Sequence, residues 1–356
     1  MTLDISDTRP VLITGGCGFI GCNLADRLAG EGANVLILDS LVRGGVRENA
    51  NWLKSRHGER VRISICDIRD PIRVIDAVRE ARAVLHLAAQ VAVTSSLENP
   101  VDDFEINVRG TINVLEAVRL HNSEAPLIFA STNKVYGRLI DDTQIERAGQ
   151  RYLPKDGALA AGVADTMPLD FYSPYGCSKG AADQYVRDYA RVFGLRAAVM
   201  RMSCIYGPRQ FGTEDQGWIA HFVLSALRGE RLTIYGDGYQ VRDALFVSDA
   251  VEAWIAVLRN IELARGRTFN LGGGIANSIS LLELIQLIAG LTGNDVGHDF
   301  ADWRPGDQPW YVTDISALSK TVGWKPKIGV EDGLIRLQDW LRTRVQHPIG
   351  TREAFA

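Results

Sequence analysis

Cysteine is scarce in this chain of 356 residues: there are five, and none lie in a CxxC pair. Their spacing resembles no zinc site, so we expect no bound metal. The five residues instead fit small buried side chains in a reducing compartment. This scarcity therefore favours a cytoplasmic protein whose chemistry does not depend on a metal.

The sequence also lacks an excess of charge of one sign and any long hydrophobic run. Lysine and arginine number 39 against 43 acidic residues, for a net charge of −4. Such a chain has no general attraction for nucleic acid or an anionic membrane. No stretch approaches the roughly 20 apolar residues of a membrane span. Residues 1–10 lack the apolar core of a signal peptide. We expect no nucleic-acid or membrane partner, and an anionic ligand would need local arginines.

What the chain does have is a regular alternation of short apolar runs and amphipathic segments. Its hydrophobic content of 46% and charged content of 23% are ordinary for a globular protein. Nearly continuous apolar strands separated by helices predict βαβ units and a parallel sheet buried on both faces. The predicted fold class is therefore α/β, a doubly wound Rossmann sheet. The predicted strands are 11–14, 34–39, 61–66, 83–88, 127–130 and 196–205, and the predicted helices 19–28, 71–80, 102–120 and 174–193.

The pattern loosens after residue 205 into Gly- and Pro-containing loops with short helices at 218–227 and 280–289. We expect a smaller C-terminal lobe that roofs the carboxyl ends of the strands, where open α/β sheets bind ligands. The predicted division assigns 1–205 plus 242–273 to the Rossmann domain and 206–241 plus 274–345 to the interleaved lobe.

A glycine-rich turn follows the first predicted strand and opens the first helix. Gly15, Gly18 and Gly21 are spaced as GxxGxxG, which permits a tight turn and lets a pyrophosphate approach the helix N-terminus. Asp39 ends the second strand, where an acid bonds the adenosine ribose and repels a 2′-phosphate. The pattern favours NAD over NADP, with nearby Arg43 as a counter-indication. The alternatives are a plain turn and a solvated acid.

Tyr175 and Lys179 lie four residues apart at the start of a predicted helix and so share one face. Ser173 suits the N-cap of this helix, Pro174 its first position and Gly194 its end. A lysine ammonium and a positive nicotinamide ring would favour the tyrosinate, which can accept a proton from a sugar hydroxyl. Taken alone, such a pair is more often a surface feature.

Thr132 lies at the carboxyl end of the fifth predicted strand. Its hydroxyl can hydrogen-bond the same substrate oxygen as the tyrosine. The alternative is a hydroxyl that only closes a turn.

Together these residues resemble the extended short-chain dehydrogenase/reductase family, which acts on nucleotide sugars. The resemblance covers almost the whole chain and includes residues 66–68, residues 86–89 and Asn107. It implies a catalytic triad of Thr132, Tyr175 and Lys179, with Asp67 and Ile68 at the adenine. The implied cofactor-binding residues are Gly15, Gly18, Phe19, Ile20, Gly21, Asp39, Ser40, Arg43, Asp67, Ile68, Leu87, Ala88, Ala89, Gln90, Asn107, Tyr175 and Lys179.

The two residues after Thr132 indicate which reaction of this family is disfavoured. The 4,6-dehydratases of this family carry an acidic pair there, which moves protons at carbons 5 and 6. Here the positions hold Asn133 and Lys134, neither of which supplies a carboxylate. A dehydratase is disfavoured, which leaves an epimerisation or a net dehydrogenation.

Four longer blocks are similar to the subfamily of CDP-paratose 2-epimerases, which form CDP-tyvelose: residues 131–137, 173–185, 215–218 and 240–243. This resemblance implies oxidation of a CDP-hexose at carbon 2 by tightly held NAD. The 2-keto sugar then rotates and is reduced on its other face. The cofactor is recycled, so net redox is zero.

Arginines near the expected crevice suit a diphosphate substrate. In the family, arginines matching Arg242 and Arg304 clamp the pyrophosphate. Arg201, inside a predicted strand, is expected to be structural. One departure is Cys204, where many relatives have an asparagine that touches the substrate. The substrate-binding residues expected are Thr132, Asn133, Cys204, Arg209, Gln210, Arg242 and Arg304.

The sequence alone leaves other functions open. A 4-epimerase of a UDP- or CDP-sugar would use the same triad. A non-catalytic Rossmann regulator that senses NAD is disfavoured by the joint presence of Tyr175 and Lys179. Helices at Asp102 and Pro174 are candidates for a homo-dimer or homo-tetramer interface. The polar segment 141–170 fits either a lid or a subunit contact.

Overall fold

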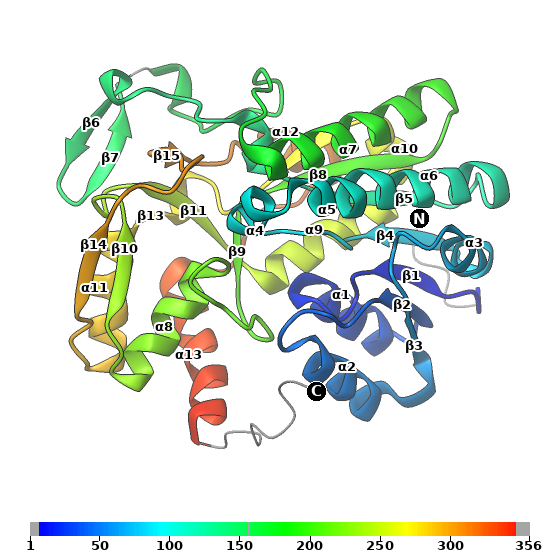
Figure 1. The fold of residues 1–356 in the computed structure, drawn as a ribbon, viewed down its shortest axis with the longest axis horizontal. Helices are drawn as coiled ribbons and strands as arrows, with labels where there is room; N and C mark the ends of the chain where they lie inside the picture. The colour runs from blue at the N-terminus through cyan, green and yellow to red at the C-terminus, as the bar shows by residue number, and fades with distance from the viewer. Residues whose placement is uncertain (1–6, 156, 347–356) are drawn as a thin grey trace.

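A computed structural model describes residues 7–155 and 157–346. Its centre is a seven-stranded parallel sheet with the order β12-β8-β5-β4-β1-β2-β3 (Figure 1). This is the Rossmann order with one added strand, which confirms the predicted fold class. The strand order reverses between the neighbours β1 and β4, and a ligand crevice is expected outside their carboxyl ends. The strands are β1 (Val11–Thr14), β2 (Val35–Asp39), β3 (Val61–Ile65), β4 (Ala83–His86), β5 (Leu127–Thr132), β8 (Ala197–Met202) and β12 (Thr268–Leu271).

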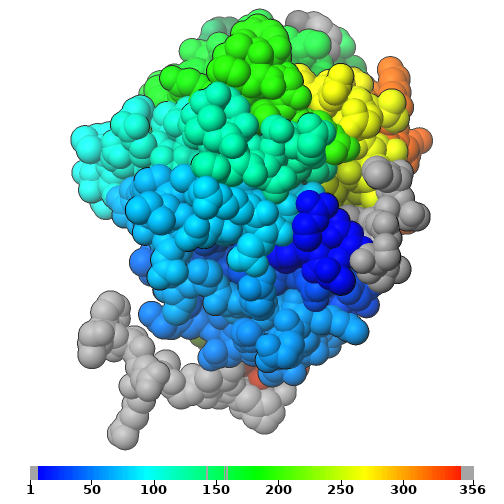
Figure 2. All heavy atoms as spheres, turned by 90° about the vertical axis from the view of Figure 1, so that its right-hand side faces the viewer, coloured from blue at the N-terminus to red at the C-terminus, as the bar shows by residue number. Residues whose placement is uncertain are grey.

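Helices cover both faces of this sheet, because successive side chains of a strand point to opposite faces. In β1, Val11 and Ile13 pack in one hydrophobic cluster and Leu12 in the other. The first cluster receives α1 (Phe19–Gly30), α2 (Val46–His57) and α9 (Val247–Arg259). The second receives α3 (Pro71–Glu80), α6 (Gly110–His121) and α7 (Ser173–Val192). Figure 2 shows the side of the molecule that lies at the right of Figure 1, with green segments at the top and blue segments towards the bottom.

The predicted helix at 102–120 is part of a longer helical run. The run consists of α5 (Pro100–Phe104), a π-helical turn (Glu105–Arg109) and α6. A short helix, α4 (Val93–Glu98), precedes it. Helix α7 begins at Ser173, with Tyr172 at the N-cap, so the expected N-cap is wrong by one residue. The Ser173 hydroxyl nevertheless accepts the N–H of Gly176 at 3.2 Å. Gly194, with φ +72°, follows its end.

The predicted strand at 196–205 is wrong as one element. It is broken at Ser203, whose N–H donates to Leu271 O at 2.9 Å and whose hydroxyl donates to Asp243 at 2.5 Å. Beyond the break, β9 (Cys204–Tyr206) leaves the large sheet and pairs with β11 (Val241–Phe246). The chain thereby leaves the seven-stranded sheet and enters a second region of the structure.

The second region, at the left of Figure 1, combines two small sheets with helices. Strand β11 also pairs with β13 and β15, and β10 pairs with β14. A hairpin of β6 and β7 projects beside them (Figure 1). The predicted domain division remains a prediction: α9 and β12 belong to the layers of the large sheet, whereas β11 belongs to the small one. Remaining elements are β6 (Ile145–Ala148), β7 (Arg151–Pro154), α8 (Trp218–Arg228), β10 (Leu232–Tyr235), α10 (Ile261–Ala264), β13 (Ser278–Ser280), α11 (Leu281–Thr292), β14 (His298–Ala301), β15 (Trp310–Tyr311), α12 (Ser316–Val322) and α13 (Val330–Gln346).

Within the described part of the chain, no helix has both the length and the apolar character needed to cross a membrane.

Candidate active site

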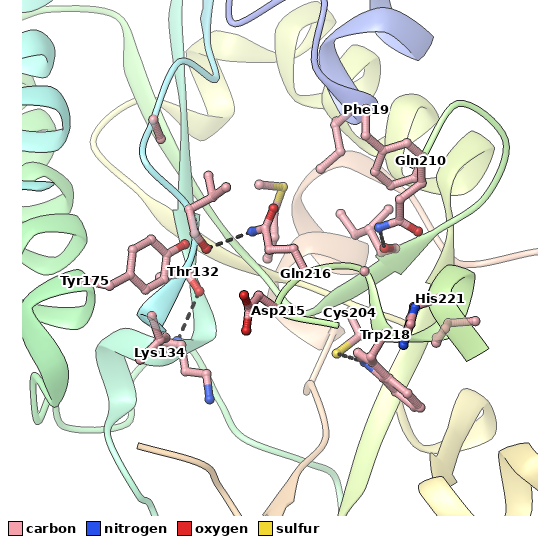
Figure 3. A pocket seen from close by; sticks show the side chains of 18 of the residues that line it. Phe19, Thr132, Lys134, Tyr175, Cys204, Gln210, Asp215, Gln216, Trp218 and His221 are labelled. Atoms are coloured by element: carbon pink, nitrogen blue, oxygen red, sulfur yellow. Dashed lines mark hydrogen bonds between the residues drawn. The ribbon is translucent and has the colours of Figure 1, made fainter. Parts of the chain in front are cut away.

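A cavity of about 510 Å³ lies between the large sheet and the second region (Figure 3). One wall comes from the turn after β1 and the residues after β4 and β5. The opposite wall comes from β9, α8, β10, β11 and residues 304–307. The expected site residues that line it are Gly15, Gly18, Phe19, Ile20, Gly21, Arg43, Leu87, Ala89, Thr132, Asn133, Tyr175, Lys179, Cys204, Arg209, Gln210, Arg242 and Arg304.

In the glycine-rich turn after β1, the backbone packs directly against neighbouring backbone segments. Gly15 has φ +67°, and a Cβ there would lie 2.7 Å from the Ala88 nitrogen. A Cβ on Gly21 would lie 2.5 Å from the Gly15 oxygen. The N-cap of α1, Gly18, offers no side-chain acceptor to the first amide groups of the helix. These N–H groups remain open to the cavity, which is the arrangement that fits a dinucleotide diphosphate.

Asp39 is fixed at the end of β2, beside this turn. Its Oδ2 accepts the N–H of Cys17 and its Oδ1 accepts the N–H of Leu41, both at 2.9 Å. A carboxylate has about four acceptor positions, so it can still accept ligand hydroxyl groups. Asp39 and Ser40 lie just outside the cavity lining, and their contact with an adenosine ribose remains a prediction.

A buried histidine that sequence reasoning gave no role fixes the loop after β4. Thr111 Oγ1 donates to Asn107 O at 2.6 Å and therefore accepts from His86 Nε2 at 3.0 Å. His86 Nδ1 then accepts from Thr14, 2.7 Å away. Burial lowers the pKa of His86 to about 3, so it stays neutral. Thr14 in turn accepts the N–H groups of Leu87 and Ala88, both at 3.2 Å.

Asn107 acts on the same loop. Its Oδ1 accepts the N–H of Gln90 at 2.9 Å, and its Nδ2 donates to Ser178 at 3.0 Å and to Asp103 at 3.2 Å. The side chain is buried and its polar atoms are occupied by protein groups. The structure thus shows Asn107 fixing the Gln90 loop, and its expected contact with a cofactor remains a prediction.

Asp67 and Ile68 also lie outside the cavity lining. The Asp67 carboxylate pairs with Arg69 at 2.7 Å. Ile68 is buried, and a Cβ on Gly110 would lie 2.5 Å from its Cγ2. Their expected contact with an adenine stays a prediction.

The structure brings the three expected catalytic side chains together. Thr132 ends β5, and Tyr175 stands beside it on the first turn of α7 (Figure 3). The Tyr175 N–H is held by Ser96 Oγ at 3.2 Å. One turn further, Lys179 Nζ donates to Ala130 O at 2.6 Å. Helical spacing and the end of one strand therefore converge on one wall of the cavity.

Burial governs the charge of this pair. Burial raises the pKa of Tyr175 to about 12, against the opposing effect of a hydrogen bond with Thr132. Burial lowers the pKa of Lys179 to about 7, against the opposing carboxylates of Asp183 and Asp103. The protein alone therefore keeps Tyr175 as a phenol, and a positive group beside it would favour the phenolate.

Asn133 and Lys134 connect this wall to the opposite one. Asn133 Nδ2 donates to Gln308 Oε1 at 3.2 Å, and Gln308 Nε2 donates to Gly137 O at 2.6 Å. Lys134 Nζ donates to Gly306 O at 3.0 Å and lies 3.5 Å from Asp307 Oδ1. Burial lowers the pKa of Lys134, while Asp307 opposes this effect. Sequence reasoning missed Gln308 and Asp307 because only the folded chain brings them to residues 133 and 134.

Arg242 and Arg304 both reach the cavity. Arg242 Nη1 donates to Val241 O at 2.8 Å, and its Nη2 lies 3.8 Å from Asp307 Oδ1. Arg304 lies 3.8 Å from the centre of the Tyr235 ring and donates to Glu214 O at 3.0 Å.

Arg209 and Gln210 follow β9. The Arg209 guanidinium lies 3.9 Å from the centre of the Trp52 ring on α2. Gln210 Nε2 donates to Ile205 O at 3.1 Å. Cys204 accepts the indole N–H of Trp218 at 3.3 Å, and burial raises the pKa of its thiol.

Arg201 is structural, as expected: it lies 2.8 Å from Asp183 in a fully buried ion pair.

A loop that sequence reasoning gave no role crosses the cavity between its two walls. Gln216 donates to Val91 O at 2.8 Å and accepts a hydrogen bond from Arg43. Asp215 Oδ1 lies 3.5 Å from Arg304 Nη2. Figure 3 shows both side chains within the cavity, across from Thr132. Residues 215–218 could have been suspected only from the resemblance that includes them.

Among the residues that the structure describes, no group of three or more His, Cys, Asp or Glu side chains could hold a metal ion.

Comparison with known proteins gives a consistent result. Residues 12–337 match the family described as GDP-mannose 4,6 dehydratase. The CDP-paratose 2-epimerase of Salmonella typhi is 43% identical over 336 residues, which cover 93% of this chain and 98% of that relative. The UDP-glucose 4-epimerase of Thermus thermophilus, solved in complex with NAD, has a TM-score of 0.78 at 33% identity, covering 94% and 99% of the two chains. The UDP-glucose 4-epimerase of Thermotoga maritima, solved with UDP-glucose, has a TM-score of 0.81 at 29% identity, again covering 94% and 99%.

Proposed function

Because the chain belongs to the family of nucleotide-sugar epimerases and dehydratases matched by the GDP-mannose 4,6 dehydratase description, we propose that it is a NAD-dependent epimerase that inverts carbon 2 of a CDP-hexose. One observation carries this proposal. The Thr132, Tyr175 and Lys179 triad stands in the cavity, but Asn133 and Lys134 occupy the positions of the dehydratase acids. The 43% identity to a CDP-paratose 2-epimerase supports carbon 2 and the cytidine nucleotide.

The cavity fits NAD on the sheet side. The open N-terminus of α1 and the closely packed Gly15 and Gly21 would hold the diphosphate. Asp39 would accept the hydroxyl groups of the adenosine ribose. When bound, NAD would supply the hydride acceptor and donor for the sugar carbon that is inverted. Because net redox is zero, a retained cofactor serves repeated turnovers.

Three side chains of this chain would handle the proton. Tyr175 accepts the proton of the 2-hydroxyl group as the carbon is oxidised and gives it back on reduction. Thr132 would orient the same oxygen, since its hydroxyl lies on the same wall of the cavity as Tyr175. Lys179, one turn along α7, brings a positive charge that lowers the pKa of Tyr175 when protonated. Arg242 and Arg304 line the substrate end and would bind the diphosphate of the nucleotide sugar.

Two alternative functions remain possible outcomes of the test. A 4-epimerase is favoured by the likeness to solved UDP-glucose 4-epimerases, and it would use the same triad with the sugar bound in another pose. A non-catalytic NAD-sensing regulator has less support, because both Tyr175 and Lys179 are present and buried at the cavity.

The testing experiment is NMR of the products after incubating the purified protein with CDP- and UDP-hexoses, without added cofactor. The proposal predicts inversion at carbon 2 of a CDP-sugar. Inversion at carbon 4 would transfer the assignment to the alternative epimerase. No turnover even with NAD supplied would contradict both epimerase assignments.

We also propose a homo-dimer or homo-tetramer of cytoplasmic location. Apolar side chains are exposed on α5 (Val101, Phe104) and on α7 (Val192), and these helices pack against each other. The described cysteines are all free, as in a reducing compartment. Sedimentation of the wild type and of Phe104→Glu, with the exposed Ile72→Glu on α3 as control, tests the interface: only the Phe104 variant should dissociate.

A further inference from the structure

Lys134 is a cation built into the wall of the cavity next to the catalytic threonine. Its N–H donates to Thr132 Oγ1 at 3.2 Å, and its side chain lines the cavity. The side chain is only 21% exposed. Its ammonium has three donors, of which one is used by Gly306 O at 3.0 Å and a second points to Asp307 at 3.5 Å. One donor is left for a ligand.

The charged groups around Lys134 add up to a net positive charge. Asp307 is shared by Lys134 at 3.5 Å and Arg242 at 3.8 Å, so two cations face one carboxylate. Arg304 differs, because it already lies near the carboxylates of Glu214 and Asp215. An anionic oxygen between Lys134 and Arg242 would therefore find the least competition from protein acids.

The chemistry of a nucleotide-diphosphate hexose relates this position to the reacting carbon. The diphosphate is attached to carbon 1, carbon 2 is its neighbour, and carbon 4 lies across the ring. For carbon 2 to meet Thr132 and Tyr175, the β-phosphate must lie close to the triad. A phosphate-binding cation is then needed close to the triad. The Lys134 N–H donates to Thr132 Oγ1, and its ammonium group reaches Gly306 O and Asp307 on the opposite wall.

We propose that Lys134, together with Arg242, binds the β-phosphate of the nucleotide sugar and thereby selects carbon 2 as the reacting carbon. The inference rests on the proposed function. A β-phosphate held on this wall also serves as a fixed point, about which the keto sugar can rotate to present its other face. A carboxylate at position 134 would repel the phosphate, which is consistent with a different substrate pose where the family carries an acid there.

The test compares nucleotides that differ only by the β-phosphate. Calorimetric titration measures binding of CDP and CMP, and of UDP and UMP, to the purified protein carrying its cofactor. The variants are Lys134→Met, Lys134→Arg, and the matched control Lys54→Met, an exposed lysine on α2. We expect Lys134→Met to weaken diphosphate binding by roughly tenfold or more, as for loss of a charged hydrogen bond. Monophosphate binding should change less than about twofold, and Lys134→Arg should retain most of the affinity.

Equal losses for diphosphate and monophosphate, or no loss, would overturn the inference. Bound-cofactor content equal to that of Lys54→Met keeps a folding defect from imitating the result. Product NMR of the wild type is the separate arm for the proposed function. Inversion at carbon 4 there would refute selection of carbon 2, even where Lys134→Met weakens diphosphate binding. Inversion at carbon 2, with an unchanged diphosphate affinity in Lys134→Met, would refute the role of Lys134 alone.

Discussion

At the scale of single residues, burial moves the pKa values of Tyr175 and Lys179 in opposite directions. Burial raises the pKa of the tyrosine to about 12 and lowers that of the lysine to about 7. Both shifts favour the neutral forms, because a low-dielectric site disfavours either charge. If Tyr175 transfers the proton as proposed, a positive group beside it would favour its phenolate at neutral pH.

Tyr175→Phe removes the proton acceptor while keeping the ring. We expect the turnover number to fall by about 10²–10⁴-fold, the usual contribution of a general acid–base group. NAD content, measured on the released cofactor, should match the wild type. The control is Tyr185→Phe on the same helix, because Tyr185 is 45% exposed. Near wild-type turnover in Tyr175→Phe would refute the proton-transfer role.

Lys179→Met should change how the stability of the protein depends on pH. The folded pKa of about 7 lies below the ordinary 10.5, so between these values the unfolded chain binds more protons. The wild type therefore loses stability as pH falls from 10.5 to 7. We expect the cofactor-free variant to be more stable by about 1–4 kcal/mol near pH 7, because a buried charge is removed. The gain should vanish near pH 10, as measured by denaturant unfolding, and a pH-independent difference would contradict this account.

At the scale of elements, the turn between β1 and α1 determines how closely the helix approaches the sheet. Gly15 and Gly21 touch backbone atoms where a side chain would collide. The pattern was predictable from sequence, because one strand and one helix contain it. The break between β8 and β9 was not, since Ser203 is held by Leu271 and Asp243 from distant parts of the chain. Local propensity carries no information about such partners.

Gly21→Ala tests this packing. Its Cβ would lie 2.5 Å from Gly15 O and 2.7 Å from Gly16 Cα, so helix and turn must separate. We expect a loss of about 1–3 kcal/mol in the free energy of unfolding and a protein that purifies without NAD. In Gly30→Ala, at the other end of α1, the added Cβ meets nothing within 4 Å, and stability should stay within about 1 kcal/mol. Normal NAD content in Gly21→Ala would refute the assigned role of the turn.

At the scale of the whole molecule, the site exists only where the sheet meets the second region. The glycine turn, the Tyr175–Lys179 pair and Asp39 at the end of β2 could be predicted, because each is a short motif on one or two adjoining elements. Thr132 could be named only from its place at the end of a predicted strand. The His86 hydrogen bonds, Gln308 against Asn133, and Gln216 between Arg43 and Val91 could not. These contacts join residues far apart in sequence, so only the assembled fold defines them. The same assembly puts the expected diphosphate arginines opposite the triad.

The most direct measurement follows the hydrogen on carbon 2. A CDP-hexose carrying deuterium at carbon 2 is converted in ordinary water, without added cofactor, and the inverted product is examined by mass spectrometry and NMR. Oxidation and reduction by one retained cofactor predict that the deuterium stays on carbon 2 of the product. Loss of the label to water would contradict hydride transfer at carbon 2, and with it the central claim about this enzyme.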